Sequence, residues 1–475
     1  MKSFLTILIL TFGLVFVSCK SNPPEPPTRN PDREATNVGN STKTPNYKFA
    51  DGFTYHEWKG ESVITWDKVP FSFNELKTWY KPGKYWGKGY FNNTWYVVKK
   101  LVTSKYFDIY VDITDGTSIF KAATNMTDVA YDKLIRELEK DYNRMKSIYG
   151  EHSDVDGNGK IEIIFHNVQL PELGNNWAGY FNAENIWKRY LYTGEADILY
   201  IRGGKYMNAK AQKDKKFDTT CADTIFHELQ HDMRAKSGAA WKPERWIDEA
   251  LALSTYIVRH NGTNSGRTPN LAYTNTIVNG KYFFDWENIT DSENYETAAN
   301  FMYWLYIHGG GDQIIRDIVN SNPNKVIDMD SIGTAARKNI PFFKNQNYMT
   351  VVKTWYVANF KNESNSIYGY KNRNQNIKVG MANNRSGKVT LRPYCAVYTT
   401  PDMYSANSST EGLYLEKIKN SRGEEWLLLL NIYTSIKYGH SVEVKINPNV
   451  NITFSPLFID EKYMWTDGVF YEDEE

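Results

Sequence analysis

Strand-like and helix-like segments alternate along the chain between about residues 101 and 335. FDIYVDI (107–113), KIEIIFHNV (160–168) and ADILYI (196–201) carry the β-branched and aromatic residues that are typical of strands. Between the first two segments, apolar residues recur at helical spacing. They are Tyr131, Leu134, Ile135, Leu138, Tyr142 and Met145. Such alternation predicts a core of the α/β or α+β class, and we expect α+β.

The regions that flank this core also show strand patterns. Residues 47–100 hold short aromatic and β-branched runs between Gly, Pro and Asn, which predicts a small N-terminal β domain. After aromatic helical segments that follow residue 336, strand patterns return and predict a C-terminal β-sandwich over 376–475. A chain of 475 residues is too long for one hydrophobic core. We therefore expect a central domain over 101–375, with a helical C-terminal part.

The first 18 residues have the pattern of an export signal, in which a basic residue precedes an apolar stretch. FVSC (16–19) resembles the cleavage box of bacterial lipoproteins, with Phe16 in the place of the usual leucine. The resemblance implies that Cys19 is lipidated and anchors the protein to the outer membrane or cell surface; an ordinary secreted protein is the alternative. Residues 19–46 are rich in Pro, Asn, Ser and Thr and predict a flexible stalk.

The charge balance, the apolar segments and the cysteines bear on nucleic-acid binding, membrane spans and disulfides. The chain has 56 Lys and Arg against 55 Asp and Glu, so no net field attracts nucleic acid, and we expect no nucleic-acid partner. After the signal, no segment is apolar enough to cross a bilayer. Cys221 and Cys395 are the cysteines besides Cys19. A disulfide between them and two buried free thiols both stay open.

The segment HELQH, residues 227–231, is the strongest indication of chemistry. On a helix, His227 and His231 stand one turn apart on the same face and can direct two imidazoles at one metal ion. Glu228 lies between them, where it can contact a metal-bound water without binding the ion. The alternative is an ordinary helix that carries two imidazoles.

A third candidate ligand, Glu249, lies on the next predicted helix. Pro243 can begin this helix and Asn261-Gly262 can end it. Most residues around Glu249 are apolar, and a carboxylate on an apolar helix face is unfavourable unless it is paired or bound to metal. Because catalytic zinc normally has three protein ligands and an open position, His227, His231 and Glu249 predict such a site.

HELQH followed by WIDEALA (246–252) resembles the gluzincin metallopeptidases. The wider series DVDGNGKIEIIF, AGYF, ADILYI and DTIFHELQH resembles the hyicolysin-like neutral metalloproteases over roughly residues 101–330. The resemblance implies a gluzincin-type fold, a Zn²⁺ cofactor and a protein or peptide substrate. It also implies that Glu228 is the general base that takes a proton from zinc-bound water and passes it to the leaving amine.

The resemblance suggests further roles. NYETAANFMYWL places Tyr295 where related peptidases carry a tyrosine that donates to the oxyanion, with Tyr256 and Tyr303 as competitors. AGYF (178–181) would be an edge strand that pairs with an extended peptide, which favours endopeptidase action. The G-x-M-E-N motif of aminopeptidases is absent ahead of the HELQH helix.

Two acidic residues stand next to the candidate ligands. Asp232 follows His231 and Asp248 precedes Glu249, so either carboxylate is placed to orient an imidazole. Solvated surface charges are the alternative, and this is the interpretation that we favour.

The segment DVDGNGKIE (154–162) resembles a calcium loop, with Asp154, Asp156 and Asn158 at alternate positions. Phe165 stands at the twelfth position, where an EF-hand requires glutamate, so the segment is not an EF-hand. A weaker Ca²⁺ site and a plain Asp/Gly turn stay open, and the turn is slightly favoured. The remaining histidines are expected at the surface or in hydrogen bonds. They are His56, His152, His166, His260, His308 and His440.

The sequence therefore predicts a lipid-anchored zinc endopeptidase with a gluzincin-type catalytic domain between two β domains. The competing prediction is an adhesin-like or binding lipoprotein in which the β domains bind the partner and the metal site is degenerate.

Overall fold

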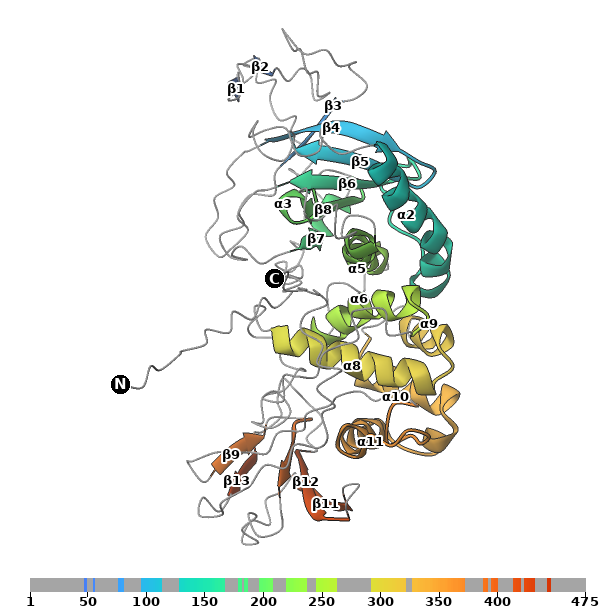
Figure 1. Ribbon diagram of the computed structural model, residues 1–475, viewed down its shortest axis with the longest axis vertical. Helices are drawn as coiled ribbons and strands as arrows, with labels where there is room; N and C mark the ends of the chain where they lie inside the picture. Colours follow the sequence, from blue (N-terminus) through green and yellow to red (C-terminus); the bar gives the residue numbers. More distant parts are fainter. Residues whose placement is uncertain are drawn as a thin grey trace, which may run out of the picture. The chain divides into compact units, whose positions relative to one another are not determined.

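The structure is a computed structural model (Figure 1) that describes the chain in part. The described residues are 47–48, 54–55, 76–80, 95–112, 128–166, 178–181, 183–186, 196–207, 219–236, 245–262, 292–321, 327–371, 388–391, 394–399, 413–419, 423–431 and 442–445. The predicted export signal, Cys19 and the stalk lie outside these residues. The described residues fall into two compact units. One lies within Val17–Arg259 and Ile315–Ser331, and the other within His260–Ile314 and Ile332–Glu475.

The first unit contains a six-stranded sheet, in the order β3-β4-β5-β6-β8-β7. Its strands are β3 (Leu76–Tyr80), β4 (Trp95–Thr103), β5 (Phe107–Asp112), β6 (Ile161–His166), β7 (Gly179–Phe181) and β8 (Ile198–Arg202). The central strands β5, β6 and β8 run parallel, whereas β3, β4 and β7 pair antiparallel with their neighbours. All six residues of β6 are buried, as expected for a parallel strand that is covered on both faces.

Strand β4 spans the predicted boundary at residue 100 and pairs with both β3 and β5. The sheet is therefore continuous across that boundary. Nearer the N-terminus, β1 (Tyr47–Lys48) and β2 (Thr54–Tyr55) form a separate pair. Most of residues 47–100 lie outside the described part, and the N-terminal β domain stays a prediction.

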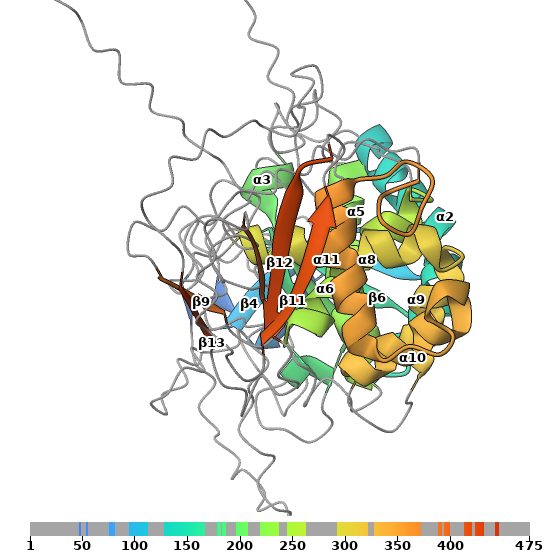
Figure 2. The ribbon, with the colours of Figure 1, turned by 90° about the horizontal axis from the view of Figure 1, so that it is seen from below.

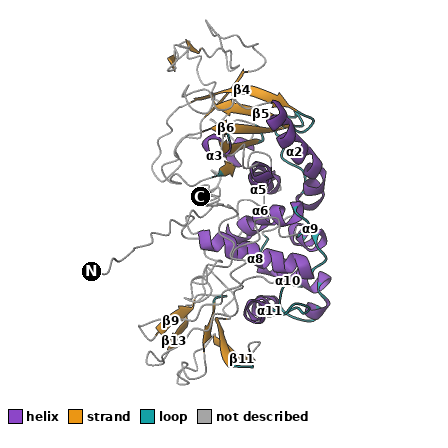
Figure 3. Cartoon of the chain, in the orientation of Figure 1, coloured by secondary structure: helices purple, strands orange, loops and turns teal. Residues whose placement is uncertain are grey.

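Three helices, α2 (Asp128–Tyr149), α3 (Gly203–Tyr206) and α5 (Cys221–Lys236), pack against this sheet (Figure 3). Helix α6 (Arg245–Arg259) packs on α5 and α2, and the 3-10 helix η2 (Ala183–Ile186) contacts α5. The predicted apolar stripe of α2 is buried except at Ile135, which is half-buried. Helix α5 contacts β7 and β8 on one side and α2 and α6 on others, and every residue from Cys221 to Ala235 is buried. Helix α5 is thus the central helix of this unit.

The second unit is mainly helical and ends in a small antiparallel sheet. It contains α8 (Ser292–His308), η5 (Pro341–Phe343) and α11 (Tyr348–Lys361), while α9 (Asp312–Asn320) and α10 (Met329–Asn339) each include a boundary between the units. Strands β10 (Ala396–Thr399), β12 (Glu425–Asn431) and β11 (Leu413–Lys419) form a three-stranded sheet, and β13 (Val442–Lys445) pairs with β9 (Lys388–Leu391).

Helix α11 packs on the three-stranded sheet, as Figure 2 shows. The ring of Phe360 stacks on Tyr398 and meets Trp426 edge-on. The mixed α+β class is confirmed, with an N-terminal sheet, a helical core and a small C-terminal antiparallel sheet. This sheet is a coarser feature than the predicted β-sandwich over 376–475, which stays a prediction. No helix in the described ranges has both the length and the apolar character needed to cross a membrane.

Candidate metal centre

Two neighbouring helices, α5 and α6, carry the three candidate ligands. Helix α5 has Asp223 in its first turn and Arg234 in its last, which suits the helix dipole. Because α5 is buried on all sides, both of its histidines are buried. On α6, Trp246, Ala250 and Leu251 are fully buried, and Glu249 is 1% exposed among them. The predicted helices and the burial of all three ligands are therefore observed.

The three side chains converge on one point. Nε2 of His227 lies 3.4 Å from Oε2 of Glu249, and Nε2 of His231 lies 3.8 Å from the same oxygen. One potential ligand atom from each residue lies within 4.8 Å of the other two. Ligand atoms bonded tetrahedrally to zinc at about 2.0–2.2 Å lie about 3.4 Å apart. Two imidazoles and a carboxylate are also a known donor set of catalytic zinc, so the residues present fit this ion.

Asp248 orients one of the imidazoles. Its Oδ2 lies 3.1 Å from Nδ1 of His231, which directs Nε2 of that ring toward Glu249. The other oxygen forms an ion pair with Arg234, whose Nε lies 3.0 Å away. Burial opposes the charged form of Asp248, but His231 and Arg234 outweigh it and hold the pKa of this carboxyl below its usual value. The favoured prediction of a solvated charge is wrong here, because α6 packs against α5 at this position.

Asp232 is also buried, and the same prediction is wrong for it. It is 0% exposed and lies against Asp197 and the backbone of Ser153. Burial, and then the nearby Asp197, raise the pKa of Asp232 well above its usual value. Nearby, Nδ1 of His152 lies 2.6 Å from the Tyr142 hydroxyl, and burial lowers the pKa of His152.

The carboxyl of Glu228 is fully buried next to the ligands. Neither of its oxygens has a hydrogen-bond partner in the part of the chain that the structure describes. Burial raises the pKa of Glu228 to about 8; Glu249 acts in the same direction, whereas His231 and the backbone of Phe181 oppose it. For His231, burial acts to lower the pKa, but Asp248 and Glu249 outweigh it and raise the pKa to about 9. A carboxyl with a pKa near neutrality is suited to proton transfer.

The tyrosine candidates lie on two helices. Tyr295 is 2% exposed on α8, in the second compact unit, and its proposed role stays a prediction. Tyr303 is also buried on α8, and its hydroxyl donates to the backbone oxygen of Gly262 at 3.4 Å. Tyr256 is half-buried on α6.

The acidic loop ahead of β6 forms a hydrogen-bonded turn. Oδ1 of Asp154 accepts from the backbone N–H of Gly159 at 2.7 Å, and Asp156 accepts from the side chain of Asn158 at 2.6 Å. Asn158 also donates to Glu162, the last residue of the DVDGNGKIE segment, at 2.8 Å. These bonds support the plain turn, and Ca²⁺ binding by Asp154, Asp156 and Asn158 stays a prediction.

The structure also places the remaining histidines and the cysteines. Besides His152, the ring of His308 lies 2.8 Å from the backbone oxygen of Gly369, as expected for a hydrogen-bonded histidine. His166 is buried in edge contact with Tyr180 and Tyr200, and His260 is half-buried. His56 and His440 lie outside the described residues. Cys221 and Cys395 are buried free thiols.

Arg259, a basic residue that the sequence pattern does not single out, links the two ligand-bearing helices. Arg259, at the end of α6, donates from Nε to Asp141 at 2.9 Å and from Nη2 to Glu137 at 3.2 Å. Nη1 donates to Asp223 in the first turn of α5. The only sequence signal was an arginine at the end of an apolar helix, which a solvent-exposed arginine would also have produced.

The arrangement defines a class of site, a buried His-His-Glu centre with an additional carboxyl beside it. No protein-family model matches the chain. The chain is 22% identical over 266 residues to the neutral metalloprotease ShpI of Staphylococcus hyicus, an alignment that covers 54% of this chain and 59% of that protein. The chain thus spans about three fifths of this relative's length. The distant relationship and the buried cluster together support a metallopeptidase function in general terms.

Proposed function

We propose that this protein is a zinc-dependent endopeptidase of the gluzincin type. The observation that carries the proposal is the convergence of His227, His231 and Glu249 beside the buried carboxyl of Glu228. The distant similarity to a neutral metalloprotease supports the same class of reaction.

His227, His231 and Glu249 would hold the zinc ion. When bound, zinc supplies a Lewis acid that polarises a carbonyl and makes water more acidic. Asp248 holds His231 in the orientation that presents Nε2 to the site, and Arg234 holds Asp248 in turn. Both contacts restrict the ring before any ion or substrate arrives.

Glu228 is the general base of the proposed reaction. Its oxygens have no hydrogen-bond partner among the described residues, so a water molecule can bind them. The carboxylate accepts a proton from the attacking water and then donates it to the nitrogen of the leaving amine. Tyr295 is proposed as the hydrogen-bond donor to the oxyanion.

Strand β7 is the proposed binding site for the substrate backbone. It is the last strand of the sheet, and β8 is its partner among the described strands. An extended peptide added to β7 on the side opposite β8 would form backbone hydrogen bonds that require no particular sequence, which suits an endopeptidase. We further propose that lipidated Cys19 anchors the protein on the extracytoplasmic side, where its protein substrates would be found.

Zinc content and casein cleavage, measured on wild type and on Glu228→Gln, test the function. We expect the variant to bind zinc like the wild type and to lose about 10²–10⁴-fold in activity, because the general base is lost. Glu424→Gln, at an exposed residue, is the matched control and should keep full activity. If zinc-loaded, folded wild type is as inactive as Glu228→Gln, the binding-lipoprotein alternative is favoured and the endopeptidase proposal fails.

A further inference from the structure

Gly179, the first residue of the edge strand β7, lies against the helix that carries the proposed general base. A Cβ atom at this position would stand 2.9 Å from Cγ2 of Thr224. It would also stand 3.0 Å from Cγ and 3.0 Å from Oε1 of Glu228. Contacts this short require the neighbouring atoms to move. Only a residue without a side chain therefore fits between β7 and α5 as they are placed.

Close approach, and not backbone conformation, is what requires glycine here. Gly179 is not among the glycines with positive φ, so its backbone conformation is open to other residues. It pairs with Ile201 in a regular antiparallel register. An alanine at this position would keep the strand but would press its methyl group against α5.

The two neighbours of Gly179 differ in how firmly they are held. Thr224 and Glu228 are one helical turn apart and both are 0% exposed. The hydroxyl of Thr224 lies 2.7 Å from the hydroxyl of Tyr206, which fixes the threonine side chain. The carboxyl of Glu228 has no hydrogen-bond partner among the described residues. A methyl group at 179 would therefore displace the carboxyl of Glu228 more readily than the side chain of Thr224.

We infer that Gly179 is a positioning residue: its missing side chain leaves the space that the Glu228 carboxyl occupies and so sets the distance between the base and a peptide bound to β7. The inference rests on the proposed function. Its physical basis is that proton transfer depends steeply on geometry, and a misplacement of about 1 Å costs on the order of a hundredfold in rate.

Close packing of β7 on α5 for stability alone is the alternative, and Thr224 allows the two to be separated. Replacing Thr224 with serine removes Cγ2, the atom nearest to the added methyl group, and keeps the hydroxyl that contacts Tyr206. The double variant Gly179→Ala/Thr224→Ser thus relieves the contact with Thr224 but keeps both contacts with Glu228.

The test compares wild type, Gly179→Ala, Thr224→Ser and the double variant by zinc content, thermal unfolding, and kcat and KM on a fluorogenic peptide that the wild type cleaves. We expect all four to bind zinc equally and Thr224→Ser to match the wild type. Gly179→Ala should lower kcat roughly tenfold or more with little change in KM. The double variant should recover the melting temperature but not kcat.

Recovery of kcat in the double variant, or an unchanged kcat in Gly179→Ala, would overturn the inference while the endopeptidase proposal stands. If Gly179→Ala does not fold, the double variant alone decides between the two explanations. Zinc-loaded wild type that cleaves no peptide is the distinct result that defeats the proposed function itself.

Discussion

Two buried polar clusters join α5 to other helices of the same unit. They differ in whether a cation from the chain itself pairs with their acidic side chains. In the first, Arg259 donates to Asp141, Glu137 and Asp223, so a cation inside the chain completes the cluster. In the second, His227, His231 and Glu249 approach one another at 3.4 and 3.8 Å, farther apart than the atoms of a hydrogen bond. We infer that the first cluster stabilises the fold, and the wider spacing in the second supports the proposal that a cation from outside the chain completes it.

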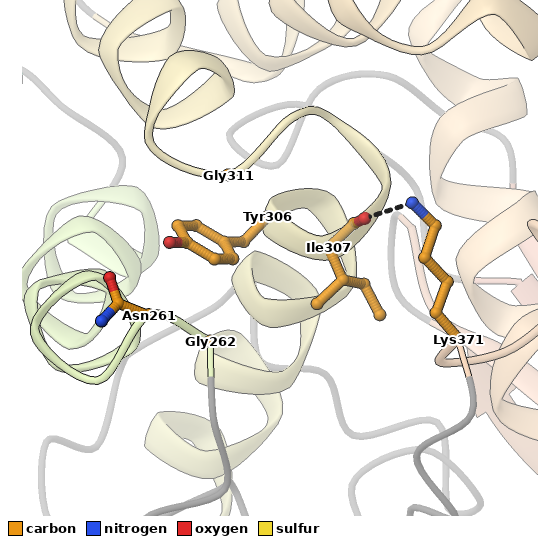
Figure 4. Close-up of a pocket in the computed structure, with 6 residues that line it drawn as sticks. All are labelled: Asn261, Gly262, Tyr306, Ile307, Gly311 and Lys371. Carbon is orange, nitrogen blue, oxygen red and sulfur yellow. Dashed lines mark hydrogen bonds between the residues drawn. The ribbon is translucent and has the colours of Figure 1, made fainter.

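The second compact unit contains a pocket that does not resemble either cluster. It has a volume of about 370 Å³ and is lined by Asn261, Gly262, Tyr306, Ile307, Gly311 and Lys371 (Figure 4). Nζ of Lys371 donates to the backbone oxygen of Ile307 at 2.6 Å, and the Tyr306 hydroxyl donates to Asp312 at 3.0 Å. The ammonium group of Lys371 thus already has a partner within the chain, as the guanidinium of Arg259 does, and we assign no ligand to this pocket.

Removing the internal cation should have the largest effect. Arg259→Met leaves the two buried carboxylates of Asp141 and Asp223 without their partner, and we expect a loss of about 3–5 kcal/mol in the free energy of unfolding, measured with urea on metal-free protein. Arg136→Met is the matched control, since Arg136 pairs with Asp132 on an exposed helix face and should change stability by less than about 1 kcal/mol. Equal losses in the two variants would show that Arg259 is not a brace.

The stability of the metal-free protein should depend on pH through the carboxyl of Glu228. Burial raises the pKa of Glu228 from its ordinary value of 4.5 to about 8, so its favourable contribution to folding is complete below pH 4.5 and is lost as the pH rises through about 8. Glu228→Gln cannot ionise and should escape this loss. We therefore expect the variant to gain stability relative to wild type between pH 5 and pH 8.5 in the presence of a chelator.

The measurement is the difference in unfolding free energy between the two proteins at each pH, in which the titration of other groups largely cancels. A difference that stays constant from pH 5 to pH 8.5 would contradict the effect of burial on Glu228.

Removing the contact between Asp248 and His231 should have a smaller effect, which we expect on the affinity for metal. Asp248→Asn removes the charge that holds His231 and pairs with Arg234. We expect zinc affinity to fall about 10–100-fold, or about 1.4–2.7 kcal/mol, in competition with a chelator. Asp330→Asn, at an exposed residue, should leave the affinity unchanged. The same affinity in both variants would show that Asp248 does not orient the ligand.

Much of the site follows from local pattern. The spacing of His227 and His231 places them on one helix face whatever surrounds that helix, because helix geometry is local. Glu249 could be identified because a carboxylate within an apolar segment needs a partner. The strand patterns at 107–113 and 196–201 likewise correspond to β5 and β8. Each of these predictions used information contained within a few turns of one element.

The predictions about Asp232 and Asp248 were wrong because they concerned exposure to solvent, which is not a local property of one helix. The exposure of a helical side chain depends on what packs against that face, and α5 is buried on all sides. Whether a charge next to a ligand is solvated or paired with Arg234 therefore depends on the position of a second helix. The pattern of a single helix does not contain this information.

The sequence by itself thus predicted the chemistry of one helix pair, namely which residues can bind a metal ion and which carboxyl can move a proton. Only the tertiary structure decided that Arg259 braces α5, that Asp248 holds His231, and that Gly179 makes room for Glu228. The physical reason is that spacing along a helix depends on covalent geometry. The other three features depend on contacts between segments that are distant in sequence, which form only when the sheet and helices have packed.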